Sequence, residues 1–145
     1  MTILMINMKS LLLLAVVTVI AVSCARYFSR GTKGGAMALA DYANVGVGEF
    51  QTLIANPVVQ LLDVRTQDEF NEGRIAGALL IDVNDSDFVD KCKAQLDASR
   101  PVAVYCRSGR RSARAASQLA AQGYKVTNLA GGVMAWQDAG KTLVK

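Results

Sequence analysis

The stretch that decides the fold is "VAVYCRSGRRSARAASQLAAQGY", residues 102–124. It begins with a short apolar run behind Pro101, turns through a segment that contains Gly109, and continues into an alanine-rich stretch that ends at Gly123. The first part is typical of a buried strand, and the last part predicts a helix over residues 112–122. A strand that leads through a short turn into a helix is half of a βαβ unit, so the stretch predicts a parallel α/β sheet.

The same alternation of strands and helices continues on both sides of this stretch. Upstream, short apolar runs and amphipathic segments predict strands at residues 42–46, 58–64 and 78–83, and helices at 47–55, 66–73 and 85–96. Downstream, the pattern predicts a strand at residues 125–129 and a helix after Gly131 and Gly132. We therefore expect an α/β fold with a central parallel sheet of about five strands and helices on both faces.

The composition excludes several kinds of site. The chain contains no histidine, so a Cys–His pair, a Ser–His–Asp triad and a His-ligated metal are all ruled out. Its three cysteines, Cys24, Cys92 and Cys106, show no C-x-x-C spacing, and we expect no metal and no cofactor. The formal net charge is +4, and four arginines within residues 107–114 supply as much. Such concentrated charge favours a small-anion site over a nucleic-acid surface, which would need a longer basic stripe.

The first 40 residues predict export. Lys9 precedes residues 11–22, which are apolar apart from Thr18 and match the apolar region of a signal peptide. This run is shorter than the roughly 20 residues that a bilayer span needs. It ends in "AVSC", residues 21–24, which resembles a bacterial lipobox and implies that Cys24 is acylated and becomes the mature N-terminus. Cleavage without lipidation and an uncleaved anchor stay open.

The predicted signal peptide determines the domain organisation that we expect. We expect a signal peptide over residues 1–23, a flexible tether over residues 24–40 and one folded domain over residues 41–145. The protein would be exported to the periplasm or cell envelope and held at the membrane by a lipid anchor. That compartment is oxidising.

Cys106 lies where the strand at residues 102–106 turns toward the helix, at the edge of the sheet where ligands bind. Gly109 permits the dihedral angles by which successive N–H groups point inward as an anion nest. The positive end of the following helix and four arginine side chains add to the field: Arg107, Arg110, Arg111 and Arg114. Such settings lower the pKa of a cysteine from about 8.5 to roughly 3.5–7.5, so a reactive thiolate needs no histidine. The alternative is an unreactive buried cysteine, which is our interpretation of Cys92 on its apolar helical face.

Three blocks of the chain resemble a single-domain rhodanese, a sulfurtransferase that uses thiosulfate or persulfides. They are "LLDVRTQDEFNEGRIAGALLI" (61–81), the stretch 102–124 and "VTNLAGGVMAW" (126–136), in the family's order. The resemblance implies that Cys106 takes up a sulfane sulfur, with no cofactor, and that the loop binds the anion. The implied substrate-binding residues are Arg107, Ser108, Gly109, Arg110, Arg111 and Ser112.

Two further positions follow from the resemblance. The family's D-x-R corresponds to Asp63 and Arg65, where Asp63 would fix local structure and Arg65 would either do the same or face the substrate pocket. The family often has histidine where this chain has Arg74, and we expect little effect on the chemistry because that segment lies outside the loop.

The function implied is sulfur transfer from a small anionic donor, thiosulfate or a persulfide, to a thiol, to cyanide or to an acceptor protein. A carrier or binding module without turnover is the first alternative. A phosphatase or arsenate reductase of the same architecture is the second, but it needs C-x5-R. The sixth residue after Cys106 is Ser112, and Arg111 comes one position too early, so the loop length favours a sulfur adduct.

Overall fold

The computed structural model describes residues 41–145, in which strands and helices alternate along the chain. The strands are β1 (Ala43–Val45), β2 (Gln60–Asp63), β3 (Leu79–Leu80), β4 (Val102–Tyr105) and β5 (Val126–Leu129). The helices are α2 (Val47–Ile54), α3 (Gln67–Glu72), α4 (Phe88–Gln95), α5 (Arg110–Ala121) and α6 (Gly132–Asp138). The predicted signal peptide, the predicted tether and Cys24 lie outside the described residues.

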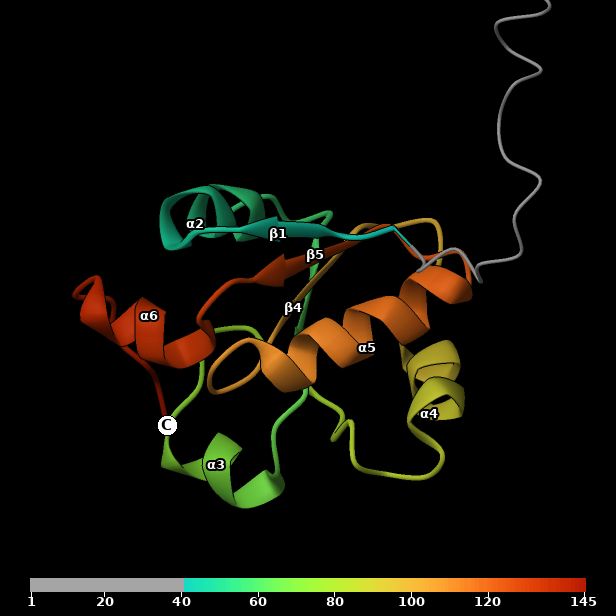
Figure 1. The fold of residues 1–145 in the computed structure, drawn as a ribbon. Coiled ribbons are helices and arrows are strands. Elements are labelled where there is room, and N and C mark those ends of the chain that lie inside the picture. The colour runs from blue at the N-terminus through green and yellow to red at the C-terminus, as the bar shows by residue number, and fades with distance from the viewer. Residues whose placement is uncertain (1–40) are drawn as a thin grey trace, which may run out of the picture. The chain divides into compact units, whose positions relative to one another are not determined.

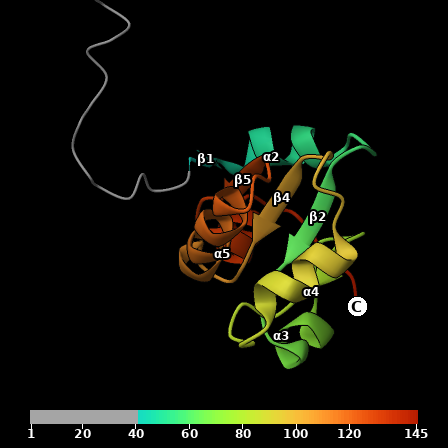
Figure 2. The ribbon, with the colours of Figure 1, turned by 90° about the vertical axis from the view of Figure 1, so that its right-hand side faces the viewer.

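The five strands form one parallel sheet in the order β1-β5-β4-β2-β3. Strand β4 lies at its centre, where Val104 is in register with Leu62 of β2 and with Asn128 of β5. Helix α2 covers one face of the sheet and α4 and α5 cover the other, as Figures 1 and 2 show from two directions. The predicted parallel α/β sheet with helices on both faces is therefore confirmed.

Side chains of each strand alternate between two hydrophobic cores, one on each face of the sheet. On the face of α4 and α5, Leu62, Val102 and Val104 pack with Phe88, Ala115 and Leu119 among others. On the face of α2 and α6, Leu61, Ala103 and Tyr105 pack with Phe50, Val133 and Trp136 among others. Cys92 is buried in the first core, as its apolar helical face predicts. Within residues 41–145, none of the helices has the length and apolarity that a bilayer span requires.

Two predicted boundaries are wrong in ways that bear on the site. Helix α5 begins at Arg110 rather than Ser112, because Gly109 adopts a φ of 89° and completes the turn two residues earlier. Helix α4 begins at Phe88 rather than Asp85, because the preceding residues form turns instead. There the Asp82 carboxylate accepts a hydrogen bond from the backbone N–H of Asn84, which competes with helix formation.

Candidate active site

Cys106 directly follows β4, at the carboxyl end of the central strand. Its side chain is completely buried, with an exposed fraction of 0%. The Cys106 loop, residues 106–112, connects β4 to the first turn of α5 and wraps around the sulfur atom. Two hydrogen-bond donors of this loop reach Sγ: the backbone N–H of Gly109 at 3.2 Å and the hydroxyl of Ser112 at 3.3 Å.

These donors determine the ionisation of the thiol. Burial alone raises the pKa of Cys106, but the Ser112 hydroxyl and the backbone N–H groups of Ser112, Ser108 and Gly109 stabilise the thiolate and lower the pKa below its usual value. Cys92 has the same burial without such donors, and its pKa is raised to about 12. Both cysteines are free, so no disulfide joins them. The loop therefore makes one of two equally buried thiols acidic.

The N-terminus of α6 supports the Cys106 loop from behind. The N–H of Val133 donates to the carbonyl of Cys106 at 2.9 Å, and the N–H of Met134 donates to the carbonyl of Arg107 at 3.1 Å. Gly132 lies so close that a Cβ there would stand 2.3 Å from the Cys106 carbonyl oxygen. The sequence indicated only a turn at Gly131 and Gly132, and the paired glycines were the one available signal of this contact.

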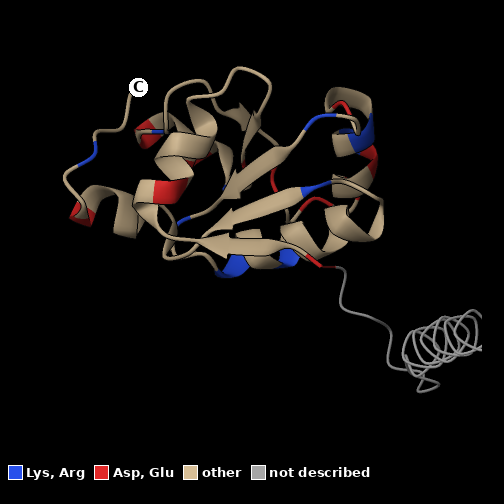
Figure 3. Ribbon diagram, turned by 90° about the horizontal axis from the view of Figure 1, so that it is seen from above, with Lys and Arg blue, Asp and Glu red and all other residues tan. Residues whose placement is uncertain are grey.

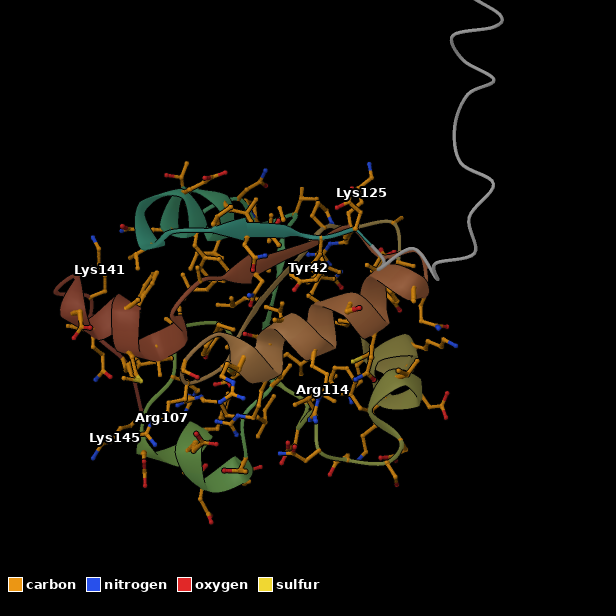
Figure 4. The ribbon with its side chains drawn as sticks, in the orientation of Figure 1. Tyr42, Arg107, Arg114, Lys125, Lys141 and Lys145 are labelled. Atoms are coloured by element: carbon orange, nitrogen blue, oxygen red, sulfur yellow. The ribbon has the colours of Figure 1, made fainter. Side chains whose placement is uncertain are left out.

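The arginines that the sequence groups together have different surroundings in the structure. Arg107 and Arg110 are exposed. Arg111 is half-buried and forms a bidentate ion pair with Glu69 of α3, with N···O distances of 2.7 and 2.6 Å. Arg114 donates to Asn84 Oδ1 at 2.9 Å. Figure 4 shows Arg107 between α6 and α3, and Arg114 beneath α5.

Two cavities adjoin the loop. The arginine cavity, about 440 Å³, is lined by Ser108, Arg110, Arg111 and Arg114. The α3–α6 cavity, about 460 Å³, is lined by Arg65, Glu69, Glu72, Gly73, Arg107, Val133, Met134, Gln137 and Leu143. The first is cationic throughout and suits a small anion, whereas the second combines both signs of charge with apolar side chains. Figure 3 shows basic and acidic residues interspersed over the ribbon, without a continuous basic stripe in this view.

Arg65 is buried with an exposed fraction of 4%, and its guanidinium is bound to protein groups. It forms an ion pair with Asp63 at 2.6 Å and donates to the Gly73 carbonyl at 2.8 Å. Asp63 also accepts from the backbone N–H of Arg65 at 3.0 Å, so the pair shapes the segment after β2. These contacts give Arg65 a structural role, and substrate binding by Arg65 stays a prediction.

Among residues 41–145, His, Cys, Asp and Glu side chains form no group of three or more that could hold a metal ion. What the loop offers instead is a stabilised thiolate beside a cationic cavity. Such an arrangement can bind a small oxyanion and present a sulfur nucleophile to it.

Known proteins resemble this chain in sequence and in fold. The family model of the rhodanese-like domain matches residues 46–139. The chain belongs to the rhodanese-like family. Over 110 residues, this rhodanese-like chain is 34% identical to a protein named thiosulfate sulfurtransferase 18 from Arabidopsis thaliana, covering 68% of the chain and 80% of the relative. It is 37% identical over 95 residues to a protein named sulfurtransferase from Allochromatium vinosum, covering 65% and 86%.

Solved structures support the same membership. The crystal structure of a rhodanese-related protein from Thermoplasma volcanium superposes with a TM-score of 0.64 at 29% identity, covering 71% of this chain and 98% of that one. The family resemblance predicted from the three sequence blocks is confirmed. Together, these relatives support rhodanese-type sulfur transfer as the general activity of the chain.

Proposed function

We propose that this protein transfers a sulfane sulfur from thiosulfate or a persulfide to a thiophilic acceptor, with Cys106 as the carrier. The observation that carries the proposal is the pair of donors on Cys106 Sγ, the Gly109 N–H and the Ser112 hydroxyl, at 3.2 and 3.3 Å. They favour a thiolate in a chain that has no histidine to act as a base.

The reaction has two displacements. In the first, the Cys106 thiolate attacks the outer sulfur of thiosulfate; a Cys106 S–S bond forms, the donor S–S bond breaks, and its electron pair leaves with sulfite. In the second, cyanide or a thiolate attacks the outer sulfur of the persulfide and leaves with it, which regenerates the Cys106 thiolate. This is covalent catalysis with ping-pong kinetics.

The arginine cavity is the docking site for the anionic donor in this proposal. Its lining residues Arg110, Arg111 and Arg114 supply positive charge, and Ser108 supplies a hydroxyl. The loop N–H groups, fixed by the N-terminus of α6, stabilise the sulfur anion and need no reorganisation as the charge moves.

Intact-protein mass spectrometry after incubation with thiosulfate tests the proposal. The native chain should gain one sulfur atom, Cys92→Ser should gain it equally, and Cys106→Ser should gain none. Cyanide should then remove the sulfur and allow repeated turnover. Equal gain by Cys106→Ser, or no gain by the native chain, contradicts the proposal, and loading without turnover identifies a carrier instead. Hydrolysis of a phenyl phosphate faster than sulfur transfer would favour a phosphatase.

We also propose that the protein works in the cell envelope as a lipoprotein anchored through Cys24. The support is the charged start, the apolar run at residues 11–22 and the lipobox-like residues 21–24. Expression of the full chain in a bacterium, with labelling by a fatty acid, should give a labelled membrane protein. Cys24→Ser should lose the label; label retained by that variant would contradict lipidation at Cys24.

A further inference from the structure

Glu69 holds the one arginine of the Cys106 loop that forms an ion pair within the described residues. Its two carboxylate oxygens accept from both terminal nitrogens of Arg111, at 2.6 and 2.7 Å. Glu69 is itself fixed from behind, because Oε2 also accepts from the backbone N–H of Thr66 at 3.1 Å in the capping box of α3. The bidentate contact uses the face by which a guanidinium clamps an oxyanion.

The pair lies between the two cavities. Glu69 lines the α3–α6 cavity and Arg111 lines the arginine cavity, so the ion pair joins the lining of one cavity to the lining of the other. The charge of Arg111 also acts on the sulfur, since Cys106 is among the groups that raise the pKa of Arg111. The Arg111 side chain therefore lies close enough to influence both a bound donor and the thiolate.

The Glu69 carboxylate is negative at neutral and mildly acidic pH. Arg111 holds the pKa of Glu69 at about 2, with a smaller contribution from Thr66. Arg110 and Arg114, which also line the arginine cavity, form no ion pair among the described residues, whereas Glu69 offsets the charge of Arg111.

We propose that Glu69 is a specificity-determining residue that limits affinity for highly charged donors by occupying Arg111 and opposing the field of the arginine cavity. The inference rests on the proposed sulfur transfer through Cys106. A specificity role of Glu69 differs from a purely supporting role in the sign of its effect on donor binding. Removing the carboxylate should strengthen donor binding, and more strongly for a donor of higher charge.

Two sulfane donors of different charge distinguish a Glu69 that determines specificity from a Glu69 that only supports Arg111. Thiosulfate is a dianion and releases sulfite; methanethiosulfonate is a monoanion and releases methanesulfinate. In both, Cys106 attacks the terminal sulfur, the donor's S–S bond breaks, and the leaving group keeps the electron pair. The step on the protein is the same, so the change in KM that a substitution at Glu69 causes, compared between the two donors, reports the effect of the donor's charge.

The test is Glu69→Gln. Glutamine has the same shape and its oxygen can still accept from Thr66, so the cap of α3 is kept. We expect the KM for thiosulfate to fall about fivefold and that for methanethiosulfonate about twofold. These changes equal about 1 and about 0.5 kcal/mol, which is the repulsion in water between the Glu69 charge and a dianion or a monoanion about 8 Å away. The kcat with cyanide as acceptor should change little.

Asp68→Asn is the matched control, since Asp68 is an exposed carboxylate of the same helix and forms no ion pair among the described residues. It should leave both KM values unchanged. A rise in both KM values in Glu69→Gln, together with a lower melting temperature, would overturn the inference and leave Glu69 a support for Arg111. An equal fall for both donors would also overturn it.

Thiosulfate binding in the Cys106→Ser background, measured by calorimetry, keeps the two proposals distinguishable. Adding Glu69→Gln to Cys106→Ser should tighten this binding about fivefold, whether or not sulfur is transferred. A native chain that never loads sulfur would overturn the proposed function alone. Unchanged or weaker binding in the double variant would overturn the role of Glu69 alone.

Discussion

At the scale of single residues, the two described cysteines show what determines the acidity of a buried thiol in this protein. Cys92 and Cys106 are both completely buried, and burial alone opposes ionisation of either. Only Cys106 receives hydrogen bonds, from the Gly109 N–H and the Ser112 hydroxyl. The acidity of a buried thiol here therefore depends on donors aimed at the sulfur, and not on its exposure or on a neighbouring base.

Ser112→Ala should weaken Cys106 as a nucleophile. The Ser112 hydroxyl is the strongest of the groups that lower the pKa of Cys106. Its loss therefore raises that pKa and reduces the fraction of thiolate at any pH below the pKa. A hydrogen bond to a charged group contributes about 1.5–3 kcal/mol, so we expect sulfur loading from thiosulfate at mildly acidic pH to slow by roughly tenfold or more. Loading should recover as the pH rises, because the variant thiol then ionises as well.

The control for this variant is Ser117→Ala, on the same helix and without a hydrogen bond to the sulfur. It should leave the pH profile of loading unchanged. If Ser112→Ala gives the same profile as the native chain, the hydroxyl does not stabilise the thiolate.

At the scale of elements, the site is made where three of them meet. Strand β4 brings Cys106 to the edge of the sheet, the first turn of α5 supplies Ser112, and α6 supports the loop through the N–H groups of Val133 and Met134. Neither β4 nor α5 alone fixes the loop, since the carbonyl groups of Cys106 and Arg107 accept hydrogen bonds from α6. The contact needs glycine at position 132, because a side chain there would meet the backbone of Cys106 and Arg107.

Gly132→Ala should abolish sulfur loading, and Gly140→Ala should not. Both glycines have a positive φ, 58° and 73°, so alanine strains the backbone at either position by roughly 1–2 kcal/mol. Only at Gly132 would the new Cβ also meet the loop, at 2.3 Å from the Cys106 carbonyl oxygen, whereas Gly140 has open space. Thermal melting and mass spectrometry of persulfide formation measure the two effects separately. Normal loading in Gly132→Ala would mean that the loop does not depend on this contact.

At the scale of the whole molecule, the described fold followed from local patterns. Apolar runs such as residues 58–64 and the glycine after α3 marked strands and turns, and alternation of the two element types predicted the parallel sheet. Element ends were less predictable. Helix α5 starts at Arg110 because Gly109 adopts a positive φ. Gly109 also packs against a segment distant in sequence, since a Cβ there would lie 3.0 Å from the nitrogen of Gly131.

Contacts between residues distant in sequence also limit what could be predicted of the candidate site. Cys106 and its loop are contiguous in sequence, so their pattern was visible. The partners of the arginines come from distant segments: Glu69 lies 42 residues before Arg111, and nothing in either neighbourhood indicates the pairing. For Arg65 the sequence leaves open a structural role and a place in the substrate pocket. The structure shows that its charge is bound to Asp63 of the same D-x-R motif and to the Gly73 carbonyl.

This buried pair leads to a prediction about overall stability. Arg65 joins Asp63 to the Gly73 carbonyl and stacks on the Tyr105 ring at 5.6 Å, so Arg65→Gln leaves a carboxylate buried without its cation. Breaking such a pair from one side costs about 3–5 kcal/mol, a large part of the 5–15 kcal/mol that holds a typical domain folded. Urea denaturation should show an early transition for Arg65→Gln. Lys91→Gln, which breaks an exposed pair with Asp85, should show little change. If the two variants unfold at the same urea concentration, Arg65 is not a structural residue, and weaker thiosulfate binding by the folded variant would then assign it to the donor site.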